Sequence, residues 1–319
     1  GATVSLSRTE LVEPPLAERL AKALAPLEDD GALLLDESDL PPSVTLLELY
    51  DDDIAGDYRA IAGRWMKNSV TSASGTGIQQ SRDLAAVVGQ APAGPMRIDL
   101  RRDGPHALVG GTTGSGKSEF LQTWILALAA EHSPERLSFL LVDYKGGSAF
   151  GECVQLPHAV GLVTDLTPHL VTRALTSLRA ELKRREETLA AKNAKDLLTL
   201  EERGDPDAPP ALAIVIDEFA ALVTEVPDFV DGVIDIAQRG RSLGLHLVMA
   251  TQRPAGVIKE SLRANTNLRI ALRVADEADS QDVLGIDRAA HFDPSTPGRA
   301  AAKLGAGRVR DFQAAYVGG

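Results

Sequence analysis

The chain has 319 residues, and 44% of them are hydrophobic, which is enough apolar material to fill the core of one large domain. Its 45 acidic and 33 basic residues give a formal net charge of -12, which disfavours nonspecific binding to a nucleic-acid backbone without a local basic patch. Cys153 is the only cysteine, which excludes a disulfide within the chain and favours a reducing compartment such as the cytoplasm.

No apolar run approaches the roughly 20 residues that a membrane-spanning helix needs. The chain begins at Gly1 rather than methionine and shows no secretion signal, so we expect it to be part of a longer protein. A cytoplasmic location is expected, and any membrane anchor would lie outside these residues.

Residues 1–94 have an irregular pattern. Apolar periodicity from Leu16 to Leu27 predicts a helix, and the glycine- and serine-rich stretch from Ser69 to Gly77 is typical of a linker. The acidic residues Asp51 to Asp53 are interpreted as a solvated loop. We therefore predict a small N-terminal helical appendage and linker up to residue 94, followed by a main domain at 95–319.

From residue 95 onward, short apolar runs alternate with helical patterns, which predicts an α/β fold with a mainly parallel sheet flanked by helices. The predicted helices are 118–130, 170–191 and 228–243, and weaker strands at 299–304 and 309–316 are expected to close the sheet in antiparallel fashion. The predicted parallel strands are 106–109, 137–142, 211–216, 245–250 and 268–274.

One segment has the spacing of a phosphate-binding loop, with two glycines separated by four residues and followed by lysine and serine. It lies directly after a predicted strand and before a predicted helix, which is the context that this motif requires. Its backbone N–H groups and the helix dipole would hold phosphate, Lys117 would reach the β- and γ-phosphates, and Ser118 would hold Mg²⁺. The expected nucleotide-binding residues are Gly111, Thr112, Thr113, Gly114, Ser115, Gly116, Lys117, Ser118 and Glu119.

Two carboxylates follow the buried strand at 211–216. Asp217 is predicted to anchor Mg²⁺ together with Ser118, and Glu218 to orient or deprotonate the attacking water. Asp143 is a rival metal ligand because it also ends an apolar strand, although it lacks a neighbouring glutamate. The pair at 217 and 218 therefore predicts ATP hydrolysis as well as binding.

Thr251 and Gln252 follow the strand at 245–250. Polar residues just beyond the carboxyl ends of parallel strands face the ligand crevice, so either residue is a candidate sensor of the γ-phosphate. The alternative is a polar helix start before Pro254.

Several blocks together resemble one family. They are GTTGSGKSE at 111–119, VIDEFA at 215–220, QRGRSLGLHL at 238–247, ATQRP at 250–254 and LRANTNLRIA at 262–271. In this order they look like the motor domain of FtsK/SpoIIIE ATPases. LVDYKGG at 141–147 and the stretch 156–165 look more like the EccC/EssC coupling ATPases of type VII secretion.

The resemblance implies a RecA-like P-loop core that assembles head to tail, with ATP at the junctions and an arginine reaching in from the neighbour. Arg241 is the position that looks like this arginine, with Arg239 as the reserve. The implied partners are other ATPase domains or copies of the chain, and a secreted protein substrate.

Three functions stay open at this point. The first is an ATPase module that drives or gates type VII protein secretion. A double-stranded DNA translocase has the same core, but the net charge of -12 disfavours DNA as a partner. A regulatory module that binds ATP and turns it over slowly is the third.

Overall fold

The computed structural model describes residues 40–51, 53–69, 83–144, 149–164, 167–254, 266–305 and 309–318. The helix expected at 16–27 and most of the linker expected at 69–77 lie outside these residues. None of the described helices is both long and apolar enough to cross a membrane.

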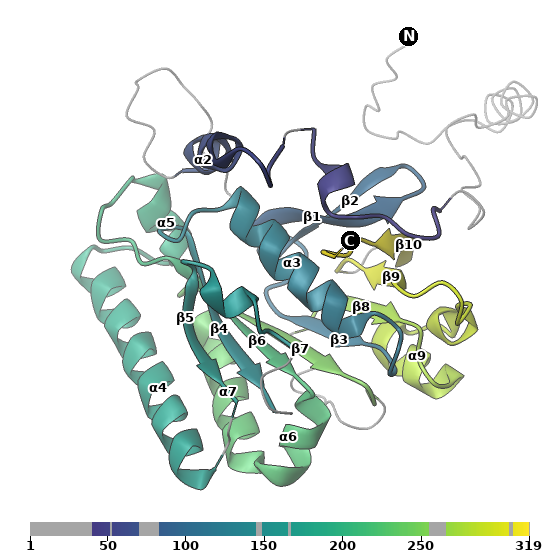
Figure 1. Cartoon of the computed structure of the whole chain (residues 1–319). Coiled ribbons are helices and arrows are strands. Elements are labelled where there is room, and N and C mark those ends of the chain that lie inside the picture. Colours follow the sequence, from purple (N-terminus) through teal and green to yellow (C-terminus); the bar gives the residue numbers. More distant parts are fainter. Residues whose placement is uncertain are drawn as a thin grey trace, which may run out of the picture. The chain divides into compact units, whose positions relative to one another are not determined.

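The strands form a ten-stranded sheet in the order β2-β1-β10-β9-β8-β3-β7-β6-β4-β5 (Figure 1). The run from β8 to β5 is parallel, and the remaining pairs are antiparallel. The parallel strands are β3 (Ala107–Gly110), β4 (Leu137–Asp143), β5 (Ala159–Val163), β6 (Ala211–Asp217), β7 (Leu245–Thr251) and β8 (Leu268–Leu272). The antiparallel strands are β1 (Ala85–Ala91), β2 (Gly94–Asp99), β9 (Arg299–Lys303) and β10 (Val309–Ala314).

This arrangement confirms the predicted fold class, the five predicted parallel strands and the antiparallel closure by β9 and β10. β5 was not predicted. It lies at the edge of the sheet, where its residues are only partly buried, so its sequence lacks the apolar density of the central strands.

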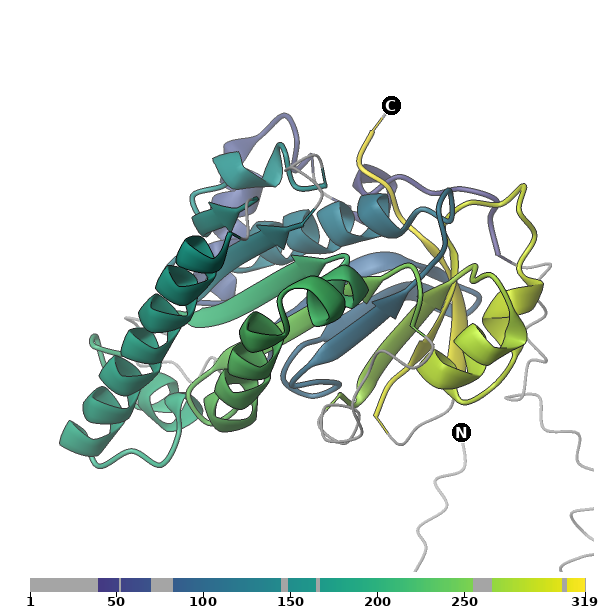
Figure 2. The same cartoon turned by 90° about the horizontal axis from the view of Figure 1, so that it is seen from below.

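Helices cover both faces of the sheet (Figures 1 and 2). The longer ones are α2 (Tyr58–Lys67), α3 (Lys117–Glu131), α4 (Pro168–Ala191), α7 (Pro227–Gly240) and α9 (Glu277–Leu284). The shorter ones are α5 (Leu197–Glu202), α6 (Phe219–Glu225) and the 3₁₀ turns η2 (Leu47–Leu49), η3 (Cys153–Gln155) and η4 (Arg288–His291).

The core is divided into two layers by the sheet. On β6, Ala213 packs in the layer that includes α3, whereas the next residue, Ile214, packs in the layer that includes α4 and α7. Successive side chains of a strand point to opposite faces, so a strand covered on both sides must be apolar at every position. This explains why β6 reads as a continuous apolar run.

The expected domain boundary at residues 94 and 95 falls at the tight turn of a hairpin. β1 ends at Ala91, β2 begins at Gly94, and β1 also pairs with β10, so residues 85–91 are part of the sheet rather than a linker. Residues 37–319 form one compact unit. The strand character of β1 was missed because glycine, glutamine and alanine dilute its two valines.

The segment before β1 also packs on this unit. Val44 and Tyr50 belong to the same core layer as α3. The backbone N–H of Leu46 donates to the Tyr316 carbonyl at 3.0 Å, and the Tyr316 N–H donates to the Val44 carbonyl at 3.1 Å. Residues 44–46 and the end of the described chain therefore lie side by side.

His132 joins the end of α3 to β1. The ring is 1% exposed, and its Nε2 donates to the Ala85 carbonyl oxygen at 3.1 Å. Burial, together with the nearby Arg136 guanidinium, lowers the pKa of His132 from 6.5 to about 4.

This histidine should make the fold sensitive to acid. From pH 7 to 5 the unfolded chain binds a proton at His132 that the folded chain cannot accept, so the free energy of unfolding falls by roughly 2 kcal/mol from this residue. His132→Gln should reduce that pH dependence in denaturant titrations. An identical pH slope in His132→Gln would contradict this assignment.

Candidate functional site

The predicted phosphate loop connects β3 to α3. Gly114 and Gly116 have φ values of 74° and 91°, a region that residues with a side chain rarely adopt. A Cβ atom on Gly111 would come within 2.7 Å of the Ser115 Oγ, so a larger residue there would require the Ser115 side chain to move. Gly114 and Gly116 therefore hold the loop in a conformation that favours glycine.

Backbone contacts to both neighbouring strands hold the start of the loop in place. The Gly111 N–H donates to the carbonyl of Thr251, the last residue of β7, at 3.1 Å. The Thr112 N–H donates to the carbonyl of Arg273, which follows β8, at 2.9 Å. The loop is therefore positioned by the sheet at the carboxyl ends of three adjacent parallel strands.

Lys117 and the two predicted carboxylates meet at this edge. The Lys117 Nζ donates to the Asp217 Oδ1 and lies 3.6 Å from the Glu218 Oε1. All three residues are at least 93% buried, since their exposed fractions are 5%, 4% and 7%. Burying two carboxylates costs free energy because their charges lose contact with water. The ammonium group between them offsets part of this cost.

The backbone of Glu218 has an unusual conformation. Its φ of 56° is in the left-handed region, which costs a residue with a side chain of order 1–3 kcal/mol. Its N–H donates to the Asp217 Oδ1 at 2.9 Å. The bend turns the chain sharply from β6 into α6, so the two adjacent carboxylates project into the same site.

Gln252 joins the phosphate loop to Glu218. Its Nε2 donates to the Glu218 Oε1 at 2.5 Å, and its Oε1 accepts a hydrogen bond from the Thr113 hydroxyl at 3.1 Å. Thr251 differs from the expectation, because it is fully buried and its hydroxyl pairs with the backbone of Arg253. Of the two candidate sensors, only Gln252 therefore faces the loop.

A pocket of about 630 Å³ opens beside the phosphate loop. The loop side consists of the predicted residues Thr112, Thr113, Gly114, Gly116, Lys117, Ser118 and Glu119, together with Gln252. The opposite side was not anticipated from the sequence, and it consists of Pro42, Ser43, Ser295, Pro297, Gly298, Gln313, Ala314, Ala315 and Tyr316. No motif marks these residues, because three separate segments contribute them.

Asp143 lies next to Asp217 in the sheet register. It is 1% exposed, and its Oδ2 accepts a hydrogen bond from the Ala149 N–H at 2.9 Å. This contact fixes the start of the following segment, which gives Asp143 a structural role beside the site. Lys145, which follows it, lies outside the described residues.

Arg241 lies far from the phosphate loop. It follows α7 and precedes β7, whereas the loop packs on the carboxyl end of β7, so the seven residues of that strand put about 20 Å between them. Arg239 forms an ion pair with Asp235 at 2.8 Å. The Arg241 side chain has no hydrogen bond or ion pair among the residues that the structure describes, and it is exposed.

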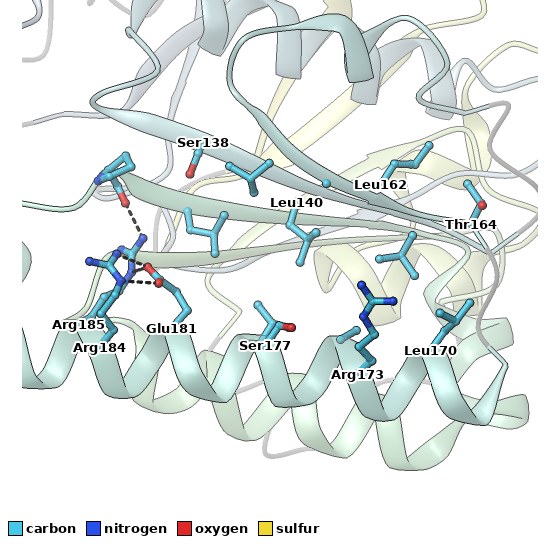
Figure 3. A pocket seen from close by; sticks show the side chains of 17 residues that line it. Ser138, Leu140, Leu162, Thr164, Leu170, Arg173, Ser177, Glu181, Arg184 and Arg185 are labelled. Atoms are coloured by element: carbon cyan, nitrogen blue, oxygen red, sulfur yellow. Dashed lines mark hydrogen bonds and ion pairs between the residues drawn. The ribbon is translucent and has the colours of Figure 1, made fainter.

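A larger pocket, of about 740 Å³, lies between the edge strand β5 and α4 (Figure 3). Its charged end is internally paired, since Arg185 bonds to Glu181 and to the carbonyls of Leu243 and Pro210 at 2.7 to 2.8 Å. None of the predicted site residues lines it. The pocket with the reactive groups is thus the smaller one at the phosphate loop.

Comparisons with known proteins show which family the chain resembles. The profile of the FtsK/SpoIIIE family matches residues 80–256. The chain is 37% identical over 286 residues to the type VII secretion system protein EssC of Staphylococcus aureus (strain NCTC 8325 / PS 47), which covers 88% of this chain and 18% of that protein. The chain therefore spans about a fifth of the length of this relative.

The solved structures to which the chain is similar include the following two. The cytoplasmic domain of the Thermomonospora curvata type VII secretion ATPase EccC has a TM-score of 0.75 at 36% identity and covers 87% of this chain and 32% of that one. The monomer form of the pCW3 conjugation coupling protein TcpA with ATPγS has a TM-score of 0.64 at 25% identity, covering 87% of this chain and 70% of that one.

Removing the Lys117 ammonium should destabilise the nucleotide-free protein. Lys117→Met leaves two buried carboxylates without their cation, which should lower the free energy of unfolding by about 3 kcal/mol. Lys183→Met, which breaks an exposed ion pair with Glu187, serves as the control and should leave the melting temperature unchanged. Equal melting temperatures for wild type and Lys117→Met would contradict a stabilising role of this contact.

Proposed function

The chain belongs to the FtsK/SpoIIIE family, and we propose that it binds and hydrolyses ATP as one ATPase domain of a type VII protein-secretion machine. The observation that carries this proposal is the convergence of Lys117, Asp217, Glu218 and Gln252 beside one pocket. Binding of nucleotide alone would not require the two carboxylates. Their position beside the phosphate loop supports hydrolysis.

Each residue has a proposed role. Nucleotide phosphates would draw the Lys117 ammonium away from Asp217, since a triphosphate offers it more negative charge. Glu218 would accept a proton from the attacking water, and Gln252 would orient Glu218 according to the state of the phosphate loop. Asp217, once released, would be free to serve as a metal ligand.

The donor set fits Mg²⁺. The Ser118 hydroxyl and the Asp217 carboxylate offer oxygen atoms, which this ion prefers, and Ser118 is the second residue of α3, next to Lys117. Mg²⁺ would neutralise charge on the phosphates. Ser118 and Asp217 are therefore the residues proposed to hold it.

Arg241 is proposed to act on the site of a neighbouring ATPase domain or a second copy of the chain. The span of β7 prevents it from reaching the phosphate loop of its own domain, and its exposure makes it available to a neighbour. A planar guanidinium can stabilise the charge of the transferred phosphoryl group. Hydrolysis would then depend on assembly, and an isolated domain would bind ATP with slow turnover.

A secretion role is favoured over DNA translocation. The names of the EssC and EccC relatives state type VII secretion, and the net charge of -12 disfavours a DNA backbone as partner. The proposed setting is the cytoplasmic face of a membrane, within a longer anchored protein that handles a protein substrate. DNA binding at micromolar affinity, with hydrolysis stimulated by DNA, would instead support a translocase.

Glu218→Gln separates binding from hydrolysis. The variant keeps the size of the side chain and one acceptor oxygen but loses the base, so ATP turnover should fall by at least about 100-fold while ATP affinity stays within a factor of a few. Phosphate release and titration calorimetry measure the two quantities. Asp228→Asn, which changes an exposed acid on α7, is the matched control. Unchanged hydrolysis in Glu218→Gln would refute its role as the base.

Arg241→Ala tests action in trans. ATP turnover per chain, measured against protein concentration with the mass followed by light scattering, should rise with assembly in the wild type. In assemblies the variant should lose at least about 100-fold of this turnover. In monomers, Arg241→Ala should have the same ATP turnover as the wild type.

Arg239→Ala, which removes an arginine two positions away, is the control for this experiment. A loss in Arg239→Ala alone would move the trans role to that residue. An equal loss for Arg241→Ala in a verified monomer would contradict action across a junction.

A further inference from the structure

We propose that the side of the pocket facing the phosphate loop is an adenine-selective base site, in which Gln313 reads the exocyclic amine of the base. The proposal rests on the nucleotide-binding function proposed above and assigns its base-recognising residues. Its basis is Gln313, which lines the pocket and whose buried Oε1 has no hydrogen-bond partner within the part of the chain that the structure describes.

This wall is joined directly to the phosphate loop. The Gly298 N–H donates to the carbonyl of Ser115, inside the loop, at 2.9 Å, and the Gly298 carbonyl accepts from the Ala314 N–H at 2.8 Å. A Cβ atom on Gly116 would lie only 3.0 Å from the Gly298 nitrogen. The phosphate-binding side and the opposite wall are therefore held in fixed register, as a ligand with a phosphate chain and a base requires.

The orientation of the Gln313 amide follows from its contacts. Its Nε2 donates to the Pro297 carbonyl at 2.9 Å, and that carbonyl can only accept, so the Oε1 occupies the other side of the amide. The residue is 1% exposed, and its Oε1 has no hydrogen-bond partner among the described residues. A buried polar atom left without a partner costs about 1–3 kcal/mol, so a ligand that donates to it gains affinity.

The chemistry of the purines makes this acceptor selective. Adenine carries an amino group at position 6, which donates hydrogen bonds, whereas guanine carries a carbonyl oxygen there, which accepts them. The Gln313 Oε1 would pair with the first and repel the second. A site built around one acceptor therefore favours adenine over guanine and over a purine with hydrogen at position 6.

Apolar residues complete the wall. Pro42 lines the pocket from the segment before β1, and the Arg299 guanidinium anchors this segment by donating to the Pro41 carbonyl at 3.2 Å. Tyr316 lines the pocket beside it, is 38% exposed, and is fixed through its backbone by residues 44–46. Its ring is proposed to stack on the base, which contributes to affinity without selecting one purine.

The test measures binding rather than turnover, using the whole chain with Mg²⁺ and ligands that are not hydrolysed. Titration calorimetry compares ADP, GDP, the diphosphate of purine riboside, and inorganic pyrophosphate. In the wild type, ADP should bind at least about tenfold more tightly than GDP and the purine riboside diphosphate. Gln313→Met should reduce both ratios to about twofold or less without changing the affinity for pyrophosphate.

Gln122→Met is the matched control, because Gln122 also donates from its Nε2 to a carbonyl, that of Ala149 at 2.8 Å, and does not line the pocket. It should retain the wild-type ratios. Equal binding of ADP and the purine riboside diphosphate by the wild type would overturn the role of Gln313.

Tyr316→Ala tests the same wall at an exposed position, should Gln313→Met fail to fold. This variant should lower the affinities for ADP and GDP equally, by about tenfold, and leave the affinity for pyrophosphate unchanged. Val317→Ala should change none of these affinities. Equal affinities of wild type and Tyr316→Ala for ADP would overturn the stacking role.

The same titrations distinguish a failure of nucleotide binding from a failure of base selection. If pyrophosphate and all three nucleotides fail to bind the wild type, the proposed nucleotide-binding function fails and the base site with it. If ADP binds and Lys117→Met abolishes its binding, but purines are not distinguished, the base site alone is wrong.

Discussion

The carboxyl ends of the parallel strands meet at one edge of the sheet, and the whole site depends on this constraint. β3 ends in the phosphate loop, β6 in the two carboxylates and β7 in Gln252, and these strands are neighbours in the sheet. Residues that are 100 and 139 positions apart in sequence thereby come within hydrogen-bonding distance. Their relative positions follow from backbone pairing, which side-chain flexibility does not alter.

Within that edge, electrostatics and backbone strain act together. Lys117 offsets the negative charge of Asp217 and Glu218, and the left-handed bend at Glu218 is the strained element that orients the second carboxylate. Gln252 then connects Glu218 with Thr113 at the tip of the loop. Two hydrogen bonds therefore connect the phosphate loop with the proposed base.

The sequence was informative where composition and local spacing decide the structure. Mostly apolar runs marked β4, β6 and β7 because a strand buried on both faces has few polar positions, and the glycine spacing marked the phosphate loop. The roles of these loop and strand-end residues remain predictions, although the structure brings most of them together. Both Thr251 and Gln252 were candidate sensors from the sequence. Only the burial of Thr251 in the structure distinguishes them.

Other features could not be predicted from sequence. β1 is rich in small residues and is recognised as a strand only by its pairing with β2 and β10. The wall that contains Gln313 combines three distant segments, and no single one carries a pattern. The separation of Arg241 from the phosphate loop of its own domain likewise could not be predicted. It follows from the length of β7 and from the position of the loop at the carboxyl end of that strand.

The contact between residues 44–46 and Tyr316 has a consequence for how the domain communicates with the polypeptide around it. These two segments lie at opposite ends of the described chain, yet they pair through their backbones and continue into one wall of the pocket. Any partner that pulls residues 42–46 away from Tyr316 must loosen that wall. By thermodynamic reciprocity, a ligand that fills the pocket must resist the pull with the same free energy. Tension on residues 42–46 and ligand binding in the pocket are thus thermodynamically coupled.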